Sequence, residues 1–116
     1  MDKINYDDFA KVEIRIGEVL SVELIEGADK LLKCMVHVGD VDVEGNMVPR
    51  QILSGIREYI EDPQSLVGKK FPYVVNLEPR TIRGFESQGM ILAAMHEDTL
   101  ALLTPTADIP PGTRLK

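Results

Sequence analysis

The stretch that decides the fold, residues 62–77 ("DPQSLVGKKFPYVVNL"), joins one helical turn directly to one apolar strand. Asp62 suits a helix N-cap, Pro63 suits the first helical position, and Gly68 is a stop signal. The apolar run from Phe71 to Leu77 follows at once and is typical of a strand. The stretch therefore predicts a short helix that leads into a strand.

Three strands are predicted upstream of this stretch. The first begins at Val12, alternates apolar and polar residues, and continues through Val22. Gly17 in its middle suggests a bulge or a sharp bend. The second strand covers residues 32–38, and the third covers about residues 48–55.

Downstream, a fifth strand is predicted at residues 88–95 and a shorter sixth at residues 100–103. A further helical turn is expected at residues 56–60. The prolines within residues 104–112 lack the N–H group that a central strand needs. This last segment is therefore expected to wrap the surface in extended form.

Five short strands with a small helix between the third and the fourth follow the order of an OB-fold barrel. A chain of 116 residues is long enough to bury one core. We therefore predict a single all-β domain over residues 1–116, a five-stranded OB-fold barrel with an extended proline-rich C-terminal segment. Such barrels bind oligonucleotides with strands two and three and with loops L12 and L45, which follow the first and the fourth strand.

Composition excludes several classes of protein. No apolar run approaches the roughly 20 residues that a membrane helix requires. The first residues lack the apolar region of a signal peptide, so we expect a cytoplasmic protein without a membrane partner. Cys34 is the only cysteine, which excludes an internal disulfide.

Catalytic and metal-binding patterns are also missing from the sequence. His37 and His96 lack the spacing of metal ligands, and Ser54 lacks the preceding glycine of a nucleophile elbow. Cys34 lies on the apolar side of its predicted strand and is interpreted as a core thiol. Residues 40–51 begin like a calcium loop but end in glutamine, so we interpret them as an acidic turn. The sequence predicts no catalysis, no cofactor and no metal.

Charge is distributed unevenly along the chain, whose formal net charge is -6. Only residues 63–95 carry an excess of positive charge. Their charged side chains are Lys69, Lys70, Arg80 and Arg83 against Glu78 and Glu86. This block contains the predicted L45, so an acidic protein offers a polyanion a basic surface there.

The segment "NLEPRTIRGFESQGMILAA" (residues 76–94) resembles the tRNA-binding OB-fold domain attached to methionyl-tRNA synthetases, which also occurs alone as a structure-specific tRNA-binding protein. Five further segments resemble the same family, in the family's order, and together cover nearly the whole chain. They are "DDFAKVEIRIGEV" (7–19), "GADKLLKCMVHVG" (27–39), "RQILSGI" (50–56), "LVGKKF" (66–71) and "LLTPTADIPPGTRL" (102–115).

The resemblance implies a non-catalytic homodimer that binds tRNA by shape rather than by base sequence. It also implies that the chain acts alone, or as a domain, subunit or partner of a methionine–tRNA ligase. Transferred residue by residue, the family's RNA-binding face falls on Lys30, Lys33, Asn76, Arg80, Arg83, Ser87 and Met90. Their chemistry agrees, because cations neutralise phosphate, amide and hydroxyl groups bond sugars or base edges, and methionine contacts an unstacked base.

Simpler interpretations remain open for these residues. Arg80 and Arg83 could pair with Glu78 and Glu86 on a solvated loop. The two lysines could be ordinary outward strand residues. Met90 is expected to face outward, and it could pack on a dimer partner instead of RNA.

Two functional hypotheses follow. The leading one is a dimeric tRNA-binding module, and the alternative is a protein-interaction or chaperone-like module on the same barrel. We expect the dimer interface to use the N-terminal segment and residues 102–115. A further reading is that the chain is the C-terminal domain of a synthetase.

Overall fold

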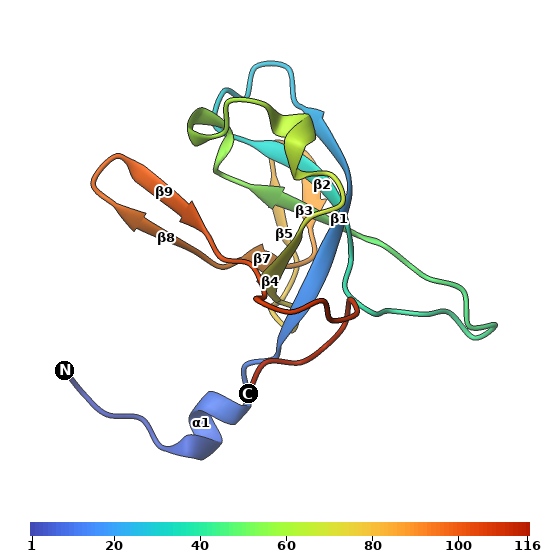
Figure 1. The fold of residues 1–116 in the computed structure, drawn as a ribbon, viewed down its shortest axis with the longest axis vertical. Helices are drawn as coiled ribbons and strands as arrows, with labels where there is room; N and C mark the ends of the chain where they lie inside the picture. The colour runs from blue at the N-terminus through green and yellow to red at the C-terminus, as the bar shows by residue number, and fades with distance from the viewer.

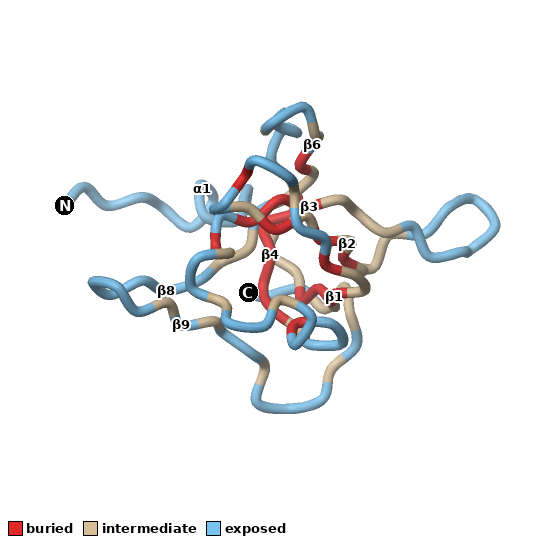
Figure 2. The backbone as a smooth tube through the Cα atoms, turned by 90° about the horizontal axis from the view of Figure 1, so that it is seen from above, coloured by how far each residue is buried: buried red, intermediate tan, exposed pale blue.

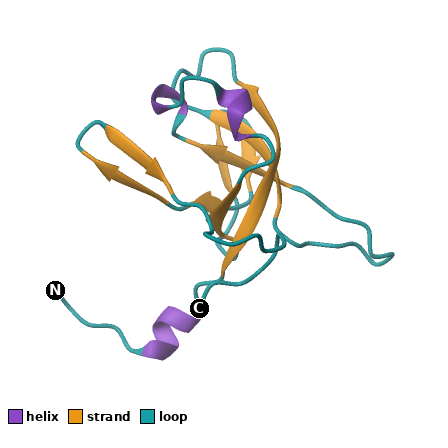
Figure 3. Ribbon diagram, in the orientation of Figure 1, coloured by secondary structure: helices purple, strands orange, loops and turns teal.

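The computed structural model describes all residues from 1 to 116, and a five-stranded antiparallel sheet curls into a nearly closed barrel at its centre (Figure 1). The hydrogen-bonded order of the strands is β3-β2-β1-β4-β7. Figure 3 shows that strands dominate and that helices are few and short. The barrel strands are β1 (Ile14–Leu24), β2 (Leu32–His37), β3 (Arg50–Ser54), β4 (Lys70–Val74) and β7 (Met90–Ile91).

The gap between β3 and β7 is bridged by the residues just before β7. The Gln88 N–H donates to the Gln51 carbonyl oxygen at 2.8 Å, and the Gln51 N–H donates to Gln88 Oε1 at 3.0 Å. The Leu53 N–H donates to Ser87 Oγ at 3.0 Å. Side chains thus replace part of a strand ladder, and the predicted five-stranded barrel with a helical turn between strands three and four is confirmed.

The core lies inside the barrel, where Figure 2 shows the buried stretches of backbone gathered. On β2 the buried residues Leu32, Cys34 and Val36 alternate with partly exposed ones, as the sequence predicted. Cys34 is therefore a core thiol, and its burial raises its pKa to about 11. Such a thiol stays protonated near neutral pH, which keeps it unreactive.

Gly17 has a different role from the predicted bulge. The irregularity in the pairing of β1 with β2 lies between Val19 and Ser21. A Cβ atom at Gly17 would lie 2.7 Å from Val36 Cγ1 and 2.9 Å from Tyr73 Cδ2. The predicted bulge is therefore not at Gly17, because this glycine makes room for core side chains from other strands, which local sequence does not reveal. The alternative of a sharp bend at Gly17 stays a prediction.

The predicted helical turns are both present as 3-10 turns. Asp62 caps η2 (Pro63–Leu66) by accepting the Gln64 N–H at 3.1 Å, and η1 (Arg57–Tyr59) occupies the other predicted turn. A further helix, α1 (Tyr6–Ala10), was not predicted. It buries no residue and stands away from the barrel (Figure 1).

The predicted fifth strand is split in two. Its first part is β7, and its second part is β8 (Ala93–His96), which pairs only with β9 (Thr99–Leu102), the predicted sixth strand. The β8–β9 hairpin projects from the barrel (Figure 1). A second hairpin that was not predicted, β5 (Arg80–Ile82) with β6 (Phe85–Ser87), lies within L45.

The C-terminal segment wraps the surface in extended form, as predicted. Ile16 bonds it twice, donating to the Thr113 carbonyl oxygen at 2.8 Å and accepting the Gly112 N–H at 2.7 Å. The Leu115 N–H donates to the Ile14 carbonyl oxygen at 2.9 Å. The residues that follow the last proline of the segment therefore cover one edge of β1.

None of the helices has the length and apolar character needed to cross a membrane.

Candidate nucleic-acid interface

L45 comprises residues 75–89. Its tip is a two-residue turn with an unusual residue in it. Arg83 and Gly84 join the paired residues Ile82 and Phe85, and their φ angles are 53° and 83°. A type I′ turn requires positive φ at both central positions, and Asn-Gly is the favoured sequence. An L residue with a Cβ atom in the left-handed region costs roughly 1–2 kcal/mol. Folding alone would therefore favour asparagine over Arg83, and such a position is a reason to look for function.

L12, residues 25–31, faces this turn. A pocket of about 350 Å³ lies between them, lined by Gly27, Ala28, Asp29, Lys30, Leu31 and Arg83. The barrel thus brings together two predicted RNA-binding residues, Lys30 and Arg83, that are far apart in the sequence.

Arg57 holds L12 through hydrogen bonds to the loop backbone. Its Nη1 donates to the Ala28 carbonyl oxygen at 2.9 Å, and its own N–H donates to the Lys30 carbonyl oxygen at 3.3 Å. The Ala28 N–H and the Leu31 N–H close turns within the loop. These bonds fix the loop backbone that carries Lys30.

Three of the predicted cations are free of acidic partners. Lys30, Arg80 and Arg83 are exposed and take part in none of the six ion pairs of the structure. The alternative in which the two arginines pair with neighbouring glutamates is therefore not what the structure shows. Their charges are available to an external anion.

Lys33 is placed differently. Its Nζ lies 3.1 Å from Glu23 Oε2 and 4.7 Å from the centroid of the Phe85 ring. The ammonium group is thus neutralised by a carboxylate and lies over an aromatic face. Phe85 is half-buried and covered on this face, so it anchors the L45 hairpin to the barrel.

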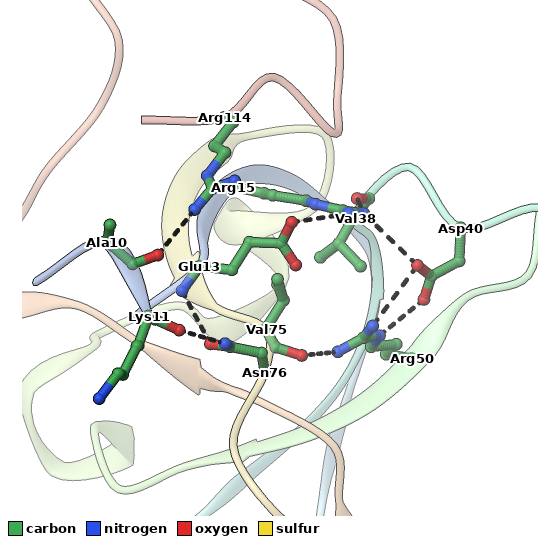
Figure 4. Close-up of polar contacts among 10 residues, drawn as sticks. All are labelled: Ala10, Lys11, Glu13, Arg15, Val38, Asp40, Arg50, Val75, Asn76 and Arg114. Carbon is green, nitrogen blue, oxygen red and sulfur yellow. Dashed lines mark hydrogen bonds and ion pairs between the residues drawn. The ribbon is translucent and has the colours of Figure 1, made fainter. Parts of the chain in front are cut away.

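Asn76, at the root of L45, bonds the N-terminal segment (Figure 4). Its Oδ1 accepts the Glu13 N–H at 2.8 Å, and its Nδ2 donates to the Lys11 carbonyl oxygen at 2.6 Å. Both ends of the amide are therefore engaged within the protein. Its contact with RNA stays a prediction and requires these bonds to be shared or exchanged.

Two other arginines near Asn76 are committed to the fold (Figure 4). Arg50 Nε lies 2.6 Å from Asp40 Oδ2, and Arg50 Nη1 donates to the carbonyl oxygens of Val75 and Gln88. Arg15 pairs with Asp40 at 3.6 Å. These side chains bind the roots of L45 and of the β2–β3 loop together, in contrast to the unpaired arginines of the hairpin.

Ser87 and Met90 complete the predicted set. Ser87 is buried, and its Oγ both accepts the Leu53 N–H and donates to the Gly89 carbonyl oxygen at 3.2 Å. Met90 is 45% exposed, which confirms that it faces outward. The hydroxyl has a structural role in closing the barrel, whereas the RNA contacts of both residues stay predictions.

Neither Arg57 nor the hairpin that carries two of the predicted cations was predicted from the sequence. The hairpin had one local signal, the glycine of the Arg83-Gly84 pair between two β-prone residues. Arg57 had none, because its partners are carbonyl oxygens some 30 residues away in the chain.

A small five-stranded barrel with unpaired cations on L12 and L45 has the arrangement typical of the oligonucleotide-binding barrels. Residues 14–114 match the sequence model of the family described as "Putative tRNA binding domain". The chain belongs to this family of tRNA-binding domains.

Individual relatives agree with this assignment. The chain is 45% identical over 114 residues to the methionine–tRNA ligase of Lactococcus lactis subsp. lactis (strain IL1403). It is 47% identical over 113 residues to that of Streptococcus pneumoniae serotype 4. Each alignment covers 97% of this chain but only 16% of the ligase, so the chain spans a small part of these relatives.

Two solved structures match over their whole length. The MetRS-related protein from Pyrococcus horikoshii superposes with a TM-score of 0.87 at 36% identity and covers 100% of both chains. The chaperone CsaA from Bacillus anthracis str. Ames superposes with a TM-score of 0.82 at 26% identity and covers 99% of this chain and 100% of its own.

Proposed function

We propose that this chain is a non-catalytic OB-fold module that binds tRNA by its shape, alone or as an appendage or trans partner of methionyl-tRNA synthetase. The observation that carries the proposal is Arg83, which occupies a left-handed turn position, has no acidic partner, and shares a pocket with Lys30. Membership of the tRNA-binding family supports it. The ligases support the proposal only through their sequence match over this chain, and their catalytic activity is not proposed for it.

The proposed interface combines charge with a few uncharged contacts. Lys30, Arg80 and Arg83 supply phosphate contacts, and Lys33 adds a fourth if RNA displaces Glu23. The uncharged contacts are proposed for Asn76, Ser87 and Met90. Aromatic residues make up only 5% of the chain, so stacking contributes little and the phosphate contacts carry the affinity. Such a role needs no cofactor or metal, and it places the protein in the cytoplasm with the tRNA.

The test of this function is a salt titration of binding to bulk tRNA, with duplex and single-stranded RNA as controls. Three unpaired cations predict that log K falls against log salt with a slope of roughly -2 to -3. The shape of tRNA should give tighter binding than either control at equal salt. Affinity that does not change between low and physiological salt would contradict the proposal.

The second candidate function is a protein-interaction or chaperone-like module. The similarity to the chaperone CsaA favours it. So does the β2–β3 loop, which exposes Val41, Val43 and Met47 among acidic residues. An acidic loop repels RNA, so this surface is suited to protein.

We also propose that the protein is a homodimer. α1 leaves Tyr6 and Phe9 exposed beside Leu115, and the β8–β9 hairpin exposes Met95. A two-stranded hairpin is marginally stable alone, and such apolar surfaces are typical of an interface. The N-terminal and C-terminal segments lie next to each other, so both can contribute to it.

Sedimentation at micromolar concentration is expected to show a dimer. Phe9→Glu should shift it toward monomer, because a carboxylate cannot be buried in an apolar interface without a partner. Val43→Glu is the matched control, since Val43 is fully exposed on the β2–β3 loop and should leave the dimer intact. A wild-type monomer under these conditions would argue against the interface.

A further inference from the structure

The pocket between L12 and the Arg83 turn has a mixed lining. Its volume of about 350 Å³ lies near the lower end of the range for small-molecule sites, about 300–1,000 Å³. Two cations, Lys30 and Arg83, one carboxylate, Asp29, and the aliphatic Ala28 and Leu31 contribute to it. A ligand that suits it must carry both an anionic group and hydrogen-bond donors.

One part of the lining is suited to phosphate. The ammonium group of Lys30 and the guanidinium group of Arg83 have no ion-pair partner. In the same loop, the N–H groups of Asp29 and Lys30 donate no hydrogen bond within the protein. Charged side chains together with free backbone N–H groups form the usual cradle of an oxyanion.

Asp29 makes a bare phosphate a poor match. An ionised carboxylate only accepts hydrogen bonds, so beside a phosphate it would repel the ligand. A ligand group that lies beside Asp29 must therefore offer N–H donors. Among the RNA bases, guanine alone presents two adjacent donors, N1–H and N2–H, on its Watson–Crick edge, and these match the two oxygens of a carboxylate. RNA-binding proteins read unpaired bases on this edge.

The pocket is fixed before any ligand binds. Arg57 bonds the L12 backbone at Ala28, and the L45 hairpin is held to the barrel by Phe85 against Lys33 and by Ser87 against Leu53. Both walls therefore rest on the barrel, and little ordering is required on binding.

We propose that this pocket binds one unpaired guanine nucleotide of the RNA, with its phosphate toward Lys30 and Arg83 and its base edge toward Asp29. The inference rests on the proposed tRNA-binding function and adds one base-specific contact to recognition by shape. Asp29 becomes the residue that determines specificity.

The test is a titration of the isotope-labelled chain with 5′-GMP, 5′-AMP, guanosine and inorganic phosphate, followed by the amide signals of residues 27–31 and 83. We expect 5′-GMP to shift these signals at concentrations about tenfold lower than 5′-AMP, the scale of one bidentate base contact. Guanosine and inorganic phosphate should each bind more weakly than 5′-GMP, because each lacks half of the ligand. Added tRNA should displace 5′-GMP.

Asp29→Asn should reduce the affinity for 5′-GMP to that for 5′-AMP, while Glu26→Gln should leave the preference unchanged. Glu26 is an exposed carboxylate on the same loop that does not line the pocket. Equal binding of 5′-GMP and 5′-AMP, or inorganic phosphate as tight as 5′-GMP, overturns the inference. Binding of tRNA is measured in parallel. If the chain binds tRNA but binds 5′-GMP no better than 5′-AMP, only the pocket assignment fails. If the chain neither binds tRNA nor prefers 5′-GMP, the proposed function is overturned as well.

Discussion

A variant that carries Arg80→Ala and Arg83→Asn is expected to bind tRNA more weakly by about 3–6 kcal/mol, the sum of two hydrogen bonds to charged groups. The slope of log K against log salt should become shallower by roughly 1.4–1.8, because two phosphate contacts are removed. Folding stability should stay the same or rise, since Arg80 has no ion-pair partner and asparagine suits the left-handed turn position. Binding and urea unfolding measured on one preparation give both results.

Weaker tRNA binding without a loss of folding stability separates a binding role from a structural one. The single variants Arg80→Ala and Glu78→Ala serve as controls for a surface ion pair. If both lower the stability and leave tRNA affinity unchanged, Arg80 belongs to the fold. Loss of stability in the double variant would likewise show that Arg83 supports the hairpin.

The second large effect is expected at Gly39, where Gly39→Ala should lower the free energy of unfolding by roughly 2–5 kcal/mol. A Cβ atom there would lie 2.7 Å from the Cα atom of Gly112, and the φ of Gly39 is 91°. The obstacle is backbone rather than a movable side chain. The C-terminal segment would have to leave the edge of β1 and give up its hydrogen bonds to Ile14 and Ile16.

Gly45→Ala is the matched control for this effect. Gly45 has a φ of 86°, but nothing lies within 4 Å of the position of its Cβ atom. Its substitution therefore measures the cost of the left-handed backbone alone, which is about 1–2 kcal/mol. Equal losses for the two variants in urea unfolding would show that the contact with Gly112 is unimportant.

Local patterns in the sequence determined the elements that depend on local interactions. The alternation of Leu32, Cys34 and Val36 set the inner face of β2, because side chains alternate across a strand. Asp62 and Pro63 set the start of η2, because capping involves only the first turn. The order of these elements was enough to predict the barrel, and strand alternation was enough to predict the outward direction of Met90. The likeness to the tRNA-binding family came from particular segments of sequence, above all residues 76–94.

Partnerships between distant residues were decided only by the tertiary structure. Ser87 closes the barrel at Leu53, and the amide of Asn76 bonds the backbone at Glu13, although both residues read as candidate RNA contacts. The same holds for Lys30 and Arg83, which share a pocket. The sequence specifies which donors and acceptors a side chain carries. Its hydrogen-bond partner is whichever group the closed barrel places within about 3 Å, and the packing of all five strands sets that distance.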